Sequence, residues 1–125
     1  MRQLPPGSLH SVRVDDLPWR ASAVAPGILV RDIALTDGWE MQMVRCDPGA
    51  RFPAHVHAGP EFLFVLEGEL VQGGRRLGPG WATVGAAGSV DADVRSDTGC
   101  VFVLVDRAAD AGPPPEPAAG GGRPA

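Results

Sequence analysis

The sequence contains no lysine, so arginine supplies every permanently cationic side chain. Lysine and arginine together number 11 against 15 acidic residues, which gives a formal net charge of −4 at pH 7. Proteins that bind nucleic acid through its phosphates carry a basic face or stripe. A mildly acidic chain without such a stripe is not expected to have nucleic acid as its main partner.

Long apolar runs are also missing. Uninterrupted aliphatic and aromatic stretches are short, as at 62–66, whereas a membrane-spanning helix needs about 20 residues. The first residues, Met1 to Pro6, lack the apolar segment of a secretory signal peptide. We therefore expect a soluble, cytoplasmic protein without a membrane partner.

Cysteine is scarce, with Cys46 and Cys100 as the two examples in 125 residues. A chain of this length forms one domain that can bury a core without disulfides. In a reducing compartment the two cysteines are expected to be free thiols packed as small apolar side chains. The alternative is a redox-active or substrate-contacting cysteine near a pocket, and the sequence leaves that choice open.

Helical periodicity is lacking too, and turn residues recur at short intervals along the chain. Both features predict an all-β sandwich or barrel. The expected strands are 28–35, 39–46, 61–66, 70–72, 81–84, 89–94 and 100–105. Within 39–46, alternation places Trp39, Met41 and Met43 on one face, which we expect to line the interior.

Composition divides the chain into three parts. Residues 1–16 mix proline, glycine and polar side chains and are expected to form an arm. The barrel is predicted over 17–107. From residue 108 to 125 proline and glycine dominate, and such a segment buries too little apolar area to order, so we expect a disordered tail.

Among the residues that are present, two histidines and a glutamate stand out between Gly49 and Gly68. His55 and His57 are two positions apart, so on a strand both point to the same side. A bend at 59–60 then brings Glu61 within reach. Two imidazoles and one carboxylate suit a divalent transition metal, whereas the plain alternative is a pair of exposed strand histidines beside an unrelated glutamate.

The spacing Gly49-x5-His55-x-His57-x3-Glu61-x6-Gly68 resembles the first motif of the cupin superfamily at every fixed position. The resemblance implies a cupin jelly-roll barrel of two antiparallel sheets. It also implies that His55, His57 and Glu61 are metal ligands. The expected cofactor is one divalent ion per chain, Fe²⁺, Zn²⁺ or Mn²⁺.

The second cupin motif is met only in part. Alignment on its glycines, Gly80 and Gly88, puts Ala86 at the proline, Asp91 at the metal-binding histidine and Arg95 at the asparagine. The surrounding segments 17–19, 47–49 and 98–103 are most similar to ChrR-like cupins. This likeness extends over about residues 17–107, without the helical sigma-binding domain of the anti-sigma factors.

Because Asp91 stands at the fourth ligand position, three interpretations of the metal site are open. If Asp91 ligates, two imidazoles and two carboxylates neutralise a divalent cation. If Asp91 is too short to reach, three ligands remain, as in non-haem iron oxygenases. Alternatively the site has lost its metal and the barrel binds only a ligand. Asp93, on the same predicted face, could replace Asp91 or hydrogen-bond a histidine.

The resemblance implies two functions of different classes. The first is a metal-dependent enzyme, a dioxygenase or isomerase acting on a small, largely apolar carbonyl or diketone-like substrate. The predicted pocket residues are Met41, Met43, Leu63, Val65, Phe102 and Leu104. The second is a metal-dependent sensor or ligand-binding module without catalysis. Related cupins commonly pair through their N-terminal strands, so a homodimer is one expectation, although the oligomeric state stays open.

Overall fold

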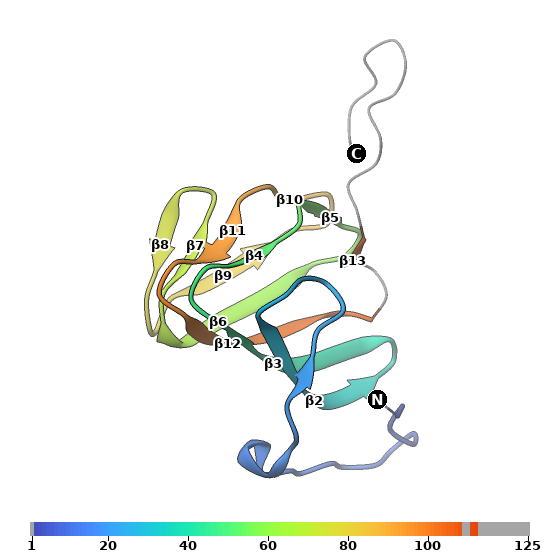
Figure 1. Cartoon of the computed structure of the whole chain (residues 1–125). Coiled ribbons are helices and arrows are strands. Elements are labelled where there is room, and N and C mark those ends of the chain that lie inside the picture. The colour runs from blue at the N-terminus through green and yellow to red at the C-terminus, as the bar shows by residue number, and fades with distance from the viewer. Residues whose placement is uncertain (1, 109–110, 113–125) are drawn as a thin grey trace.

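The structure of the chain is a computed structural model that describes residues 2–108 and 111–112 (Figure 1). Its strands are β1 (Arg20–Ala21), β2 (Ile28–Thr36), β3 (Trp39–Cys46), β4 (Ala50–Phe52), β5 (His55–His57), β6 (Glu61–Gly68), β7 (Leu70–Gln72), β8 (Arg75–Leu77), β9 (Ala82–Gly85), β10 (Val90–Asp91), β11 (Val94–Ser96), β12 (Cys100–Arg107) and β13 (Ala111–Gly112). The helix described is a 3-10 turn, Val14–Asp16. Within the described ranges no helix is long and apolar enough to span a membrane.

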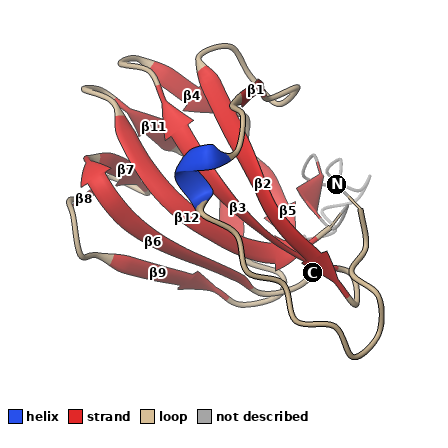
Figure 2. Cartoon of the chain, turned by 90° about the horizontal axis from the view of Figure 1, so that it is seen from below, coloured by secondary structure: helices blue, strands red, loops and turns tan. Residues whose placement is uncertain are grey.

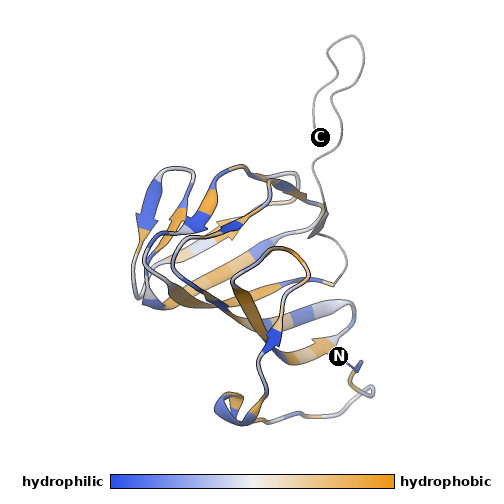
Figure 3. Cartoon of the chain, viewed as in Figure 1, coloured by the Kyte–Doolittle hydropathy of each residue, from blue (hydrophilic) through white to orange (hydrophobic). Residues whose placement is uncertain are grey.

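One layer of the molecule is a six-stranded sheet in the order β1-β2-β3-β12-β6-β9, whose main strands lie side by side in Figure 2. All its strand pairs are antiparallel. Long strands form here because β-branched and aromatic residues fill them and glycine-containing turns separate them. Figure 3 shows apolar residues concentrated along β2, β6 and β12.

The opposite layer consists of two smaller antiparallel sheets. One has the order β4-β11-β7-β8 and the other the order β10-β5-β13. This arrangement confirms the predicted all-β jelly roll, with the second layer divided in two. The division matters for the site, because the three-stranded sheet carries the histidines.

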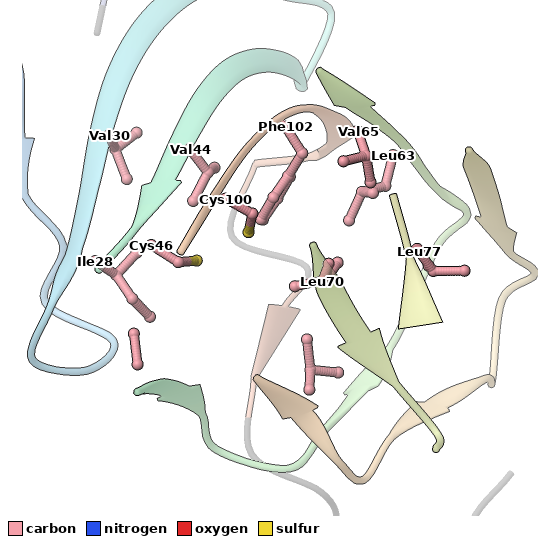
Figure 4. Packing of buried hydrophobic residues seen from close by; sticks show 12 residues of the cluster. Ile28, Val30, Val44, Cys46, Leu63, Val65, Leu70, Leu77, Cys100 and Phe102 are labelled. Atoms are coloured by element: carbon pink, nitrogen blue, oxygen red, sulfur yellow. The ribbon is translucent and has the colours of Figure 1, made fainter. Parts of the chain in front are cut away.

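The core lies between the two layers (Figure 4). Val65 and Phe102 of the large sheet, both almost fully buried, belong to the same apolar cluster as Leu70 and Leu77 of the four-stranded sheet. Cys46 and Cys100 are directly opposite each other on β3 and β12. Both side chains are buried, as expected for cysteines packed as small apolar side chains.

The inward face of β3 differs from the prediction. Glu40 and Gln42 line a cavity that His55 also borders, while Met41 is 40% exposed. Met43 also lies on the outer side, where its Sδ atom is 4.0 Å from Nη1 of Arg31. Apolar residues occupy this outer face because the N-terminal segment partly covers it: the Arg31 guanidinium stacks 4.2 Å from the ring centroid of Trp19.

The predicted division into arm, barrel and tail stays a prediction. Most of the expected tail, 108–125, lies outside the described residues. Within it, Ala111 and Gly112 form β13 and pair with His57 and Val56 of β5. That pairing places a strand from beyond β12 beside the histidine strand.

Candidate metal centre

The two histidines project from the short strand β5. His55 and His57 lie on the same side of it, with ring centroids 4.7 Å apart in an edge-to-face arrangement. Nδ1 of His55 donates a hydrogen bond to the carbonyl oxygen of Pro53 at 3.0 Å, because a carbonyl oxygen can only accept. This bond fixes the imidazole so that Nε2 points toward the other polar side chains.

Asp91 reaches the histidines through strand pairing. It lies directly opposite His55 in the antiparallel pair formed by β10 and β5, so the two side chains are on the same face. Oδ2 of Asp91 is 3.3 Å from Nε2 of His55 and 2.9 Å from Nε2 of His57. One carboxylate oxygen therefore contacts both imidazoles.

Glu61 completes the group from the first residue of β6. Its Oε2 atom lies 3.2 Å from Nδ1 of His57, four residues earlier in the chain. Burial, followed by the negative charges of Asp91 and Asp106, raises the pKa of Glu61 to about 8. Without a cation beside it, the Glu61 carboxyl group is thus mainly protonated at neutral pH.

The contact between His55 and Asp91 suits a cation between the two side chains. When His55 carries one N–H, which Nδ1 donates to Pro53, an Nε2 lone pair faces an Asp91 oxygen at 3.3 Å. Two acceptors attract each other only when a proton or a cation lies between them. A divalent ion between these side chains would be bound by His55, His57 and Asp91 at once.

The spacing of the donor atoms fits such an ion. One ligand atom each from His55, His57, Glu61 and Asp91 lies within 4.8 Å of the other three. Donors at about 2.0–2.2 Å from one metal ion are at most about 4.4 Å apart, so a small side-chain adjustment suffices. Two imidazoles and two carboxylates suit zinc, iron(II) or manganese. The described residues thus include a group that could hold a divalent metal ion.

Gln72 supports this group and was missed by the sequence reasoning. Its Nε2 atom donates a hydrogen bond of 3.2 Å to Oδ1 of Asp91, which leaves Oδ2 directed at the histidines. No motif position marks Gln72, because its role depends on β7 passing beside residue 91. Asp93 does not take part: it pairs with Arg95 at 2.7 Å, since residues 92–93, between β10 and β11, interrupt the expected alternation.

A cavity of about 400 Å³ opens beside the group, a size typical of small-molecule sites. We call it the large cavity, and its lining residues are Val24, Glu40, Gln42, Phe52, Pro53, Ala54, His55, Glu61, Leu63, Gln72, Asp91, Val94, Phe102, Leu104 and Asp106. Most of its wall is apolar. Glu40 and Asp106, directly opposite each other on β3 and β12, add carboxylates to that wall.

Three of the six predicted pocket residues line this cavity: Leu63, Phe102 and Leu104. Val65 is fully buried in the core instead. Met41 and Met43 lie on the outer side of β3, as described above. Asp106 was missed, although it continues the inward alternation of Phe102 and Leu104, so that the period of β12 could have identified it.

Sequence and structure comparisons agree on the kind of protein. The family described as ChrR cupin-like domains matches residues 8–109. No protein of curated function matches the sequence. Many solved structures share the fold. A proposed acetylacetone dioxygenase from Methylibium petroleiphilum has a TM-score of 0.75 and 19% identity, over 83% of this chain and 80% of that one.

Two further solved structures resemble the chain over most of its length. The polyketide cyclase RemF from Streptomyces resistomycificus has a TM-score of 0.70 and 21% identity, over 80% of both chains. The anti-sigma factor ChrR, in complex with SigE of Rhodobacter sphaeroides, has a TM-score of 0.63 and 20% identity. The match covers 75% of this chain and 50% of ChrR. At these identities the likeness shows a common fold.

Proposed function

The chain belongs to the family of ChrR cupin-like domains, and on that premise we propose that it binds one divalent metal ion through His55, His57, Glu61 and Asp91. We propose further that it is an enzyme of the dioxygenase type, acting on a small apolar carbonyl or diketone-like substrate. The ion would be iron(II), zinc or manganese, because the donor set contains nitrogen and carboxylate oxygen and no thiolate.

The observation that carries the proposal is the position of the donor group in the wall of the large cavity. His55, Glu61 and Asp91 border the cavity directly, next to apolar side chains such as Phe102 and Leu104. A substrate held by the apolar wall would thus lie against the metal ligands. The proposed acetylacetone dioxygenase and the polyketide cyclase with this fold make carbonyl compounds reasonable substrates to test.

The charges in the cavity favour an uncharged substrate. Its lining includes four carboxylate residues, Glu40, Glu61, Asp91 and Asp106, and no arginine among the described residues that form it. A bound divalent ion would neutralise the negative charges of two of these groups, so the wall as a whole would stay negative or become neutral. A substrate that carries a carboxylate or phosphate would be repelled or left without a cationic partner.

When bound, the metal would supply Lewis-acid chemistry by polarising a carbonyl or enolate oxygen. The residues of the chain would bind the substrate and accept its proton. Phe102 and Leu104 would hold the apolar part of the substrate and exclude water. The facing carboxylates of Glu40 and Asp106 could accept a proton from a carbon atom between two carbonyl groups.

Two measurements on the purified protein test this proposal. Elemental analysis should find one equivalent of a divalent metal per chain. The iron(II)-loaded protein should then consume oxygen with acetylacetone as the probe substrate, and a His55→Ala/His57→Ala variant should not. Conversion of the diketone without oxygen uptake would indicate an isomerase. Absence of any bound metal from wild-type protein would contradict the proposal.

The second candidate function is a metal-dependent sensor or binding module without catalysis. The likeness to ChrR, which is found in complex with a sigma factor, favours this candidate. A sensor would bind metal with the same four residues but would turn over no substrate in the large cavity. Stoichiometric metal binding combined with no oxygen uptake or product formation across a panel of diketones would favour it.

The expected homodimer and cytoplasmic location stay predictions. Phe62 and Phe64, which are 44% and 46% exposed on the outer side of β6, provide apolar surface that a second copy could cover. Light scattering of the purified protein would measure the oligomeric state. A monomeric mass at micromolar concentration would contradict the dimer.

A further inference from the structure

A second, smaller hollow lies on the other side of the donor group. It has a volume of about 220 Å³, and we call it the small pocket. Its lining residues are His57, Glu61, Gln72, Gly73, Thr83, Val84, Gly85, Ser89, Val90, Asp91 and Ala92. Val84 and Val90 are 65% and 47% exposed, so residues of its wall reach the surface.

The proposed ligands lie between the two hollows. His55 borders the large cavity and His57 borders the small pocket, whereas Glu61 and Asp91 border both. Gln72, which donates to Asp91, also borders both. An ion held by the four ligands could therefore be reached from two directions.

The walls of these two routes differ chemically. Apart from the proposed ligands, the wall of the large cavity is mainly aromatic and aliphatic, as at Phe52 and Leu63, and its polar groups are Glu40, Gln42, Gln72 and Asp106. A hydrated cation can approach those polar groups, but along the apolar part of the wall its water loses hydrogen bonds without replacement, which is costly. The small pocket offers the hydroxyl groups of Thr83 and Ser89 along its wall, which can bond to that water.

Ser89 places a buried hydroxyl group beside the small pocket. Its Oγ atom is buried and has no hydrogen-bond partner among the described residues. It lies beside Gly85, where an added Cβ atom would be 2.7 Å from the hydroxyl and 3.6 Å from Cδ2 of His57. The absence of a side chain at Gly85 thus leaves room for a polar hydroxyl next to a proposed metal ligand.

We propose that the small pocket is the route by which the metal ion reaches and leaves its ligands, while the large cavity serves the organic substrate. This inference rests on the proposed metal site. The ion passes through the small pocket with part of its hydration water, which Ser89 and Thr83 hydrogen-bond. It then exchanges that water for His57, Glu61 and Asp91. The substrate does not have to leave for the metal to exchange.

Two exposed alanines allow a matched test, because each lies on the wall of one hollow and next to one proposed ligand. Ala92 lines the small pocket beside Asp91, and Ala54 lines the large cavity beside His55. The experiment compares Ala92→Trp with Ala54→Trp in the full-length protein. It measures zinc uptake and chelator-driven zinc release by stopped flow with a fluorescent zinc indicator.

Ala92→Trp should slow uptake and release by the same factor, about tenfold or more if the indole adds at least 1.4 kcal/mol to the barrier. Zinc affinity should stay unchanged, because a blocked route alters neither the bound nor the free state. Ala54→Trp should leave both rates unchanged. Slowing by Ala54→Trp alone, by both variants equally, or by neither would overturn the inference.

Further controls keep the outcome interpretable. Val90→Trp, at another exposed position on the wall of the small pocket, repeats the test if Ala92→Trp does not fold. Circular dichroism and the melting temperature establish that each variant is folded. If wild-type protein binds no zinc, the proposed metal function fails. If wild-type protein binds zinc and the Ala92→Trp rates match it, the metal site stands and only the route is wrong.

Discussion

Oδ2 of Asp91 lies 2.9 Å from Nε2 of His57, although the two residues are 34 positions apart in the sequence. The contact exists because β10 pairs with β5 so that Asp91 is opposite His55. The same oxygen is also 3.3 Å from Nε2 of His55. Asp91 thus contacts both imidazoles from the position that the alignment of the second cupin motif gives to a third histidine.

Replacing Asp91 should change metal binding in a graded way. Asp91→Ala removes the oxygen that contacts both imidazoles and should weaken zinc binding by roughly 10- to 100-fold or more, at least the loss reported for supporting groups of metal ligands. Asp91→His should bind more tightly than Asp91→Ala and shift preference toward softer ions. Calorimetric titration with zinc and manganese measures both effects. Equal affinities in the three proteins would contradict a ligand role.

Removal of both proposed histidine ligands should abolish metal binding without unfolding the protein. In His55→Ala/His57→Ala no imidazole remains to bind a transition metal at the site, whereas the apolar core between the sheets is unchanged. The third histidine provides the control: His10 is exposed in the N-terminal segment, so His10→Ala should retain one metal per chain. Metal content is measured by elemental analysis and folding by circular dichroism. Retention of metal by the double variant would place the site elsewhere.

The raised pKa of Glu61 predicts how the stability of metal-free protein depends on pH. The folded state holds the Glu61 proton up to about pH 8, whereas the unfolded chain releases it near the ordinary value of 4.5. The unfolded state therefore binds fewer protons between these two values, and stability falls as pH rises through that window. The decline is at most about 1.4 kcal/mol per pH unit and ends above pH 8.

The control for this prediction is Glu61→Gln, which stays neutral at every pH. Its free energy of unfolding, measured in urea after removal of metal with a chelator, should lack the Glu61 contribution and fall less than that of wild type between pH 5.5 and 8. Parallel curves for the two proteins would show that Glu61 does not carry a raised pKa.

Two glycines of the first motif should differ in what they tolerate. Gly68 has φ +71°, and an added Cβ would lie 2.7 Å from Cα of Cys100. Gly49 has φ +86° but no heavy atom within 4 Å of such a Cβ. Gly49→Ala should cost only about 1–2 kcal/mol for the left-handed backbone. Gly68→Ala should cost more, because strand β12 must also move. Urea unfolding measures both, and equal losses would contradict this explanation of the motif.

The sequence by itself determined the long strands of the large sheet and the residue types of the proposed metal site. Glycine, proline and aspartate turns separate short β-rich runs, and these local signals do not depend on distant residues. Glu61 follows His57 by four positions across a bend, so its approach to the histidine is also nearly local. The first motif and the likeness to ChrR-like cupins rest on the same local pattern.

Tertiary structure decided which face of a strand is inside. On β3, both alternating faces carry apolar residues, so periodicity could not choose between Met43 and Val44. Trp19, from the N-terminal segment, stacks on Arg31 of the neighbouring strand β2, and together they cover part of the outer side. Consequently Glu40 and Gln42, and not Met41 and Met43, line the large cavity.

Tertiary structure also decided which carboxylates meet the histidines. Asp91 and Asp93 are equivalent in spacing, yet Asp91 pairs across to His55 while Asp93 turns to Arg95. Gln72 reaches Asp91 only because β7 passes nearby. Such contacts depend on strand register, and a shift of one residue would reverse every side chain. Register is fixed by the packing of the two layers as a whole, so no local stretch of sequence contains it.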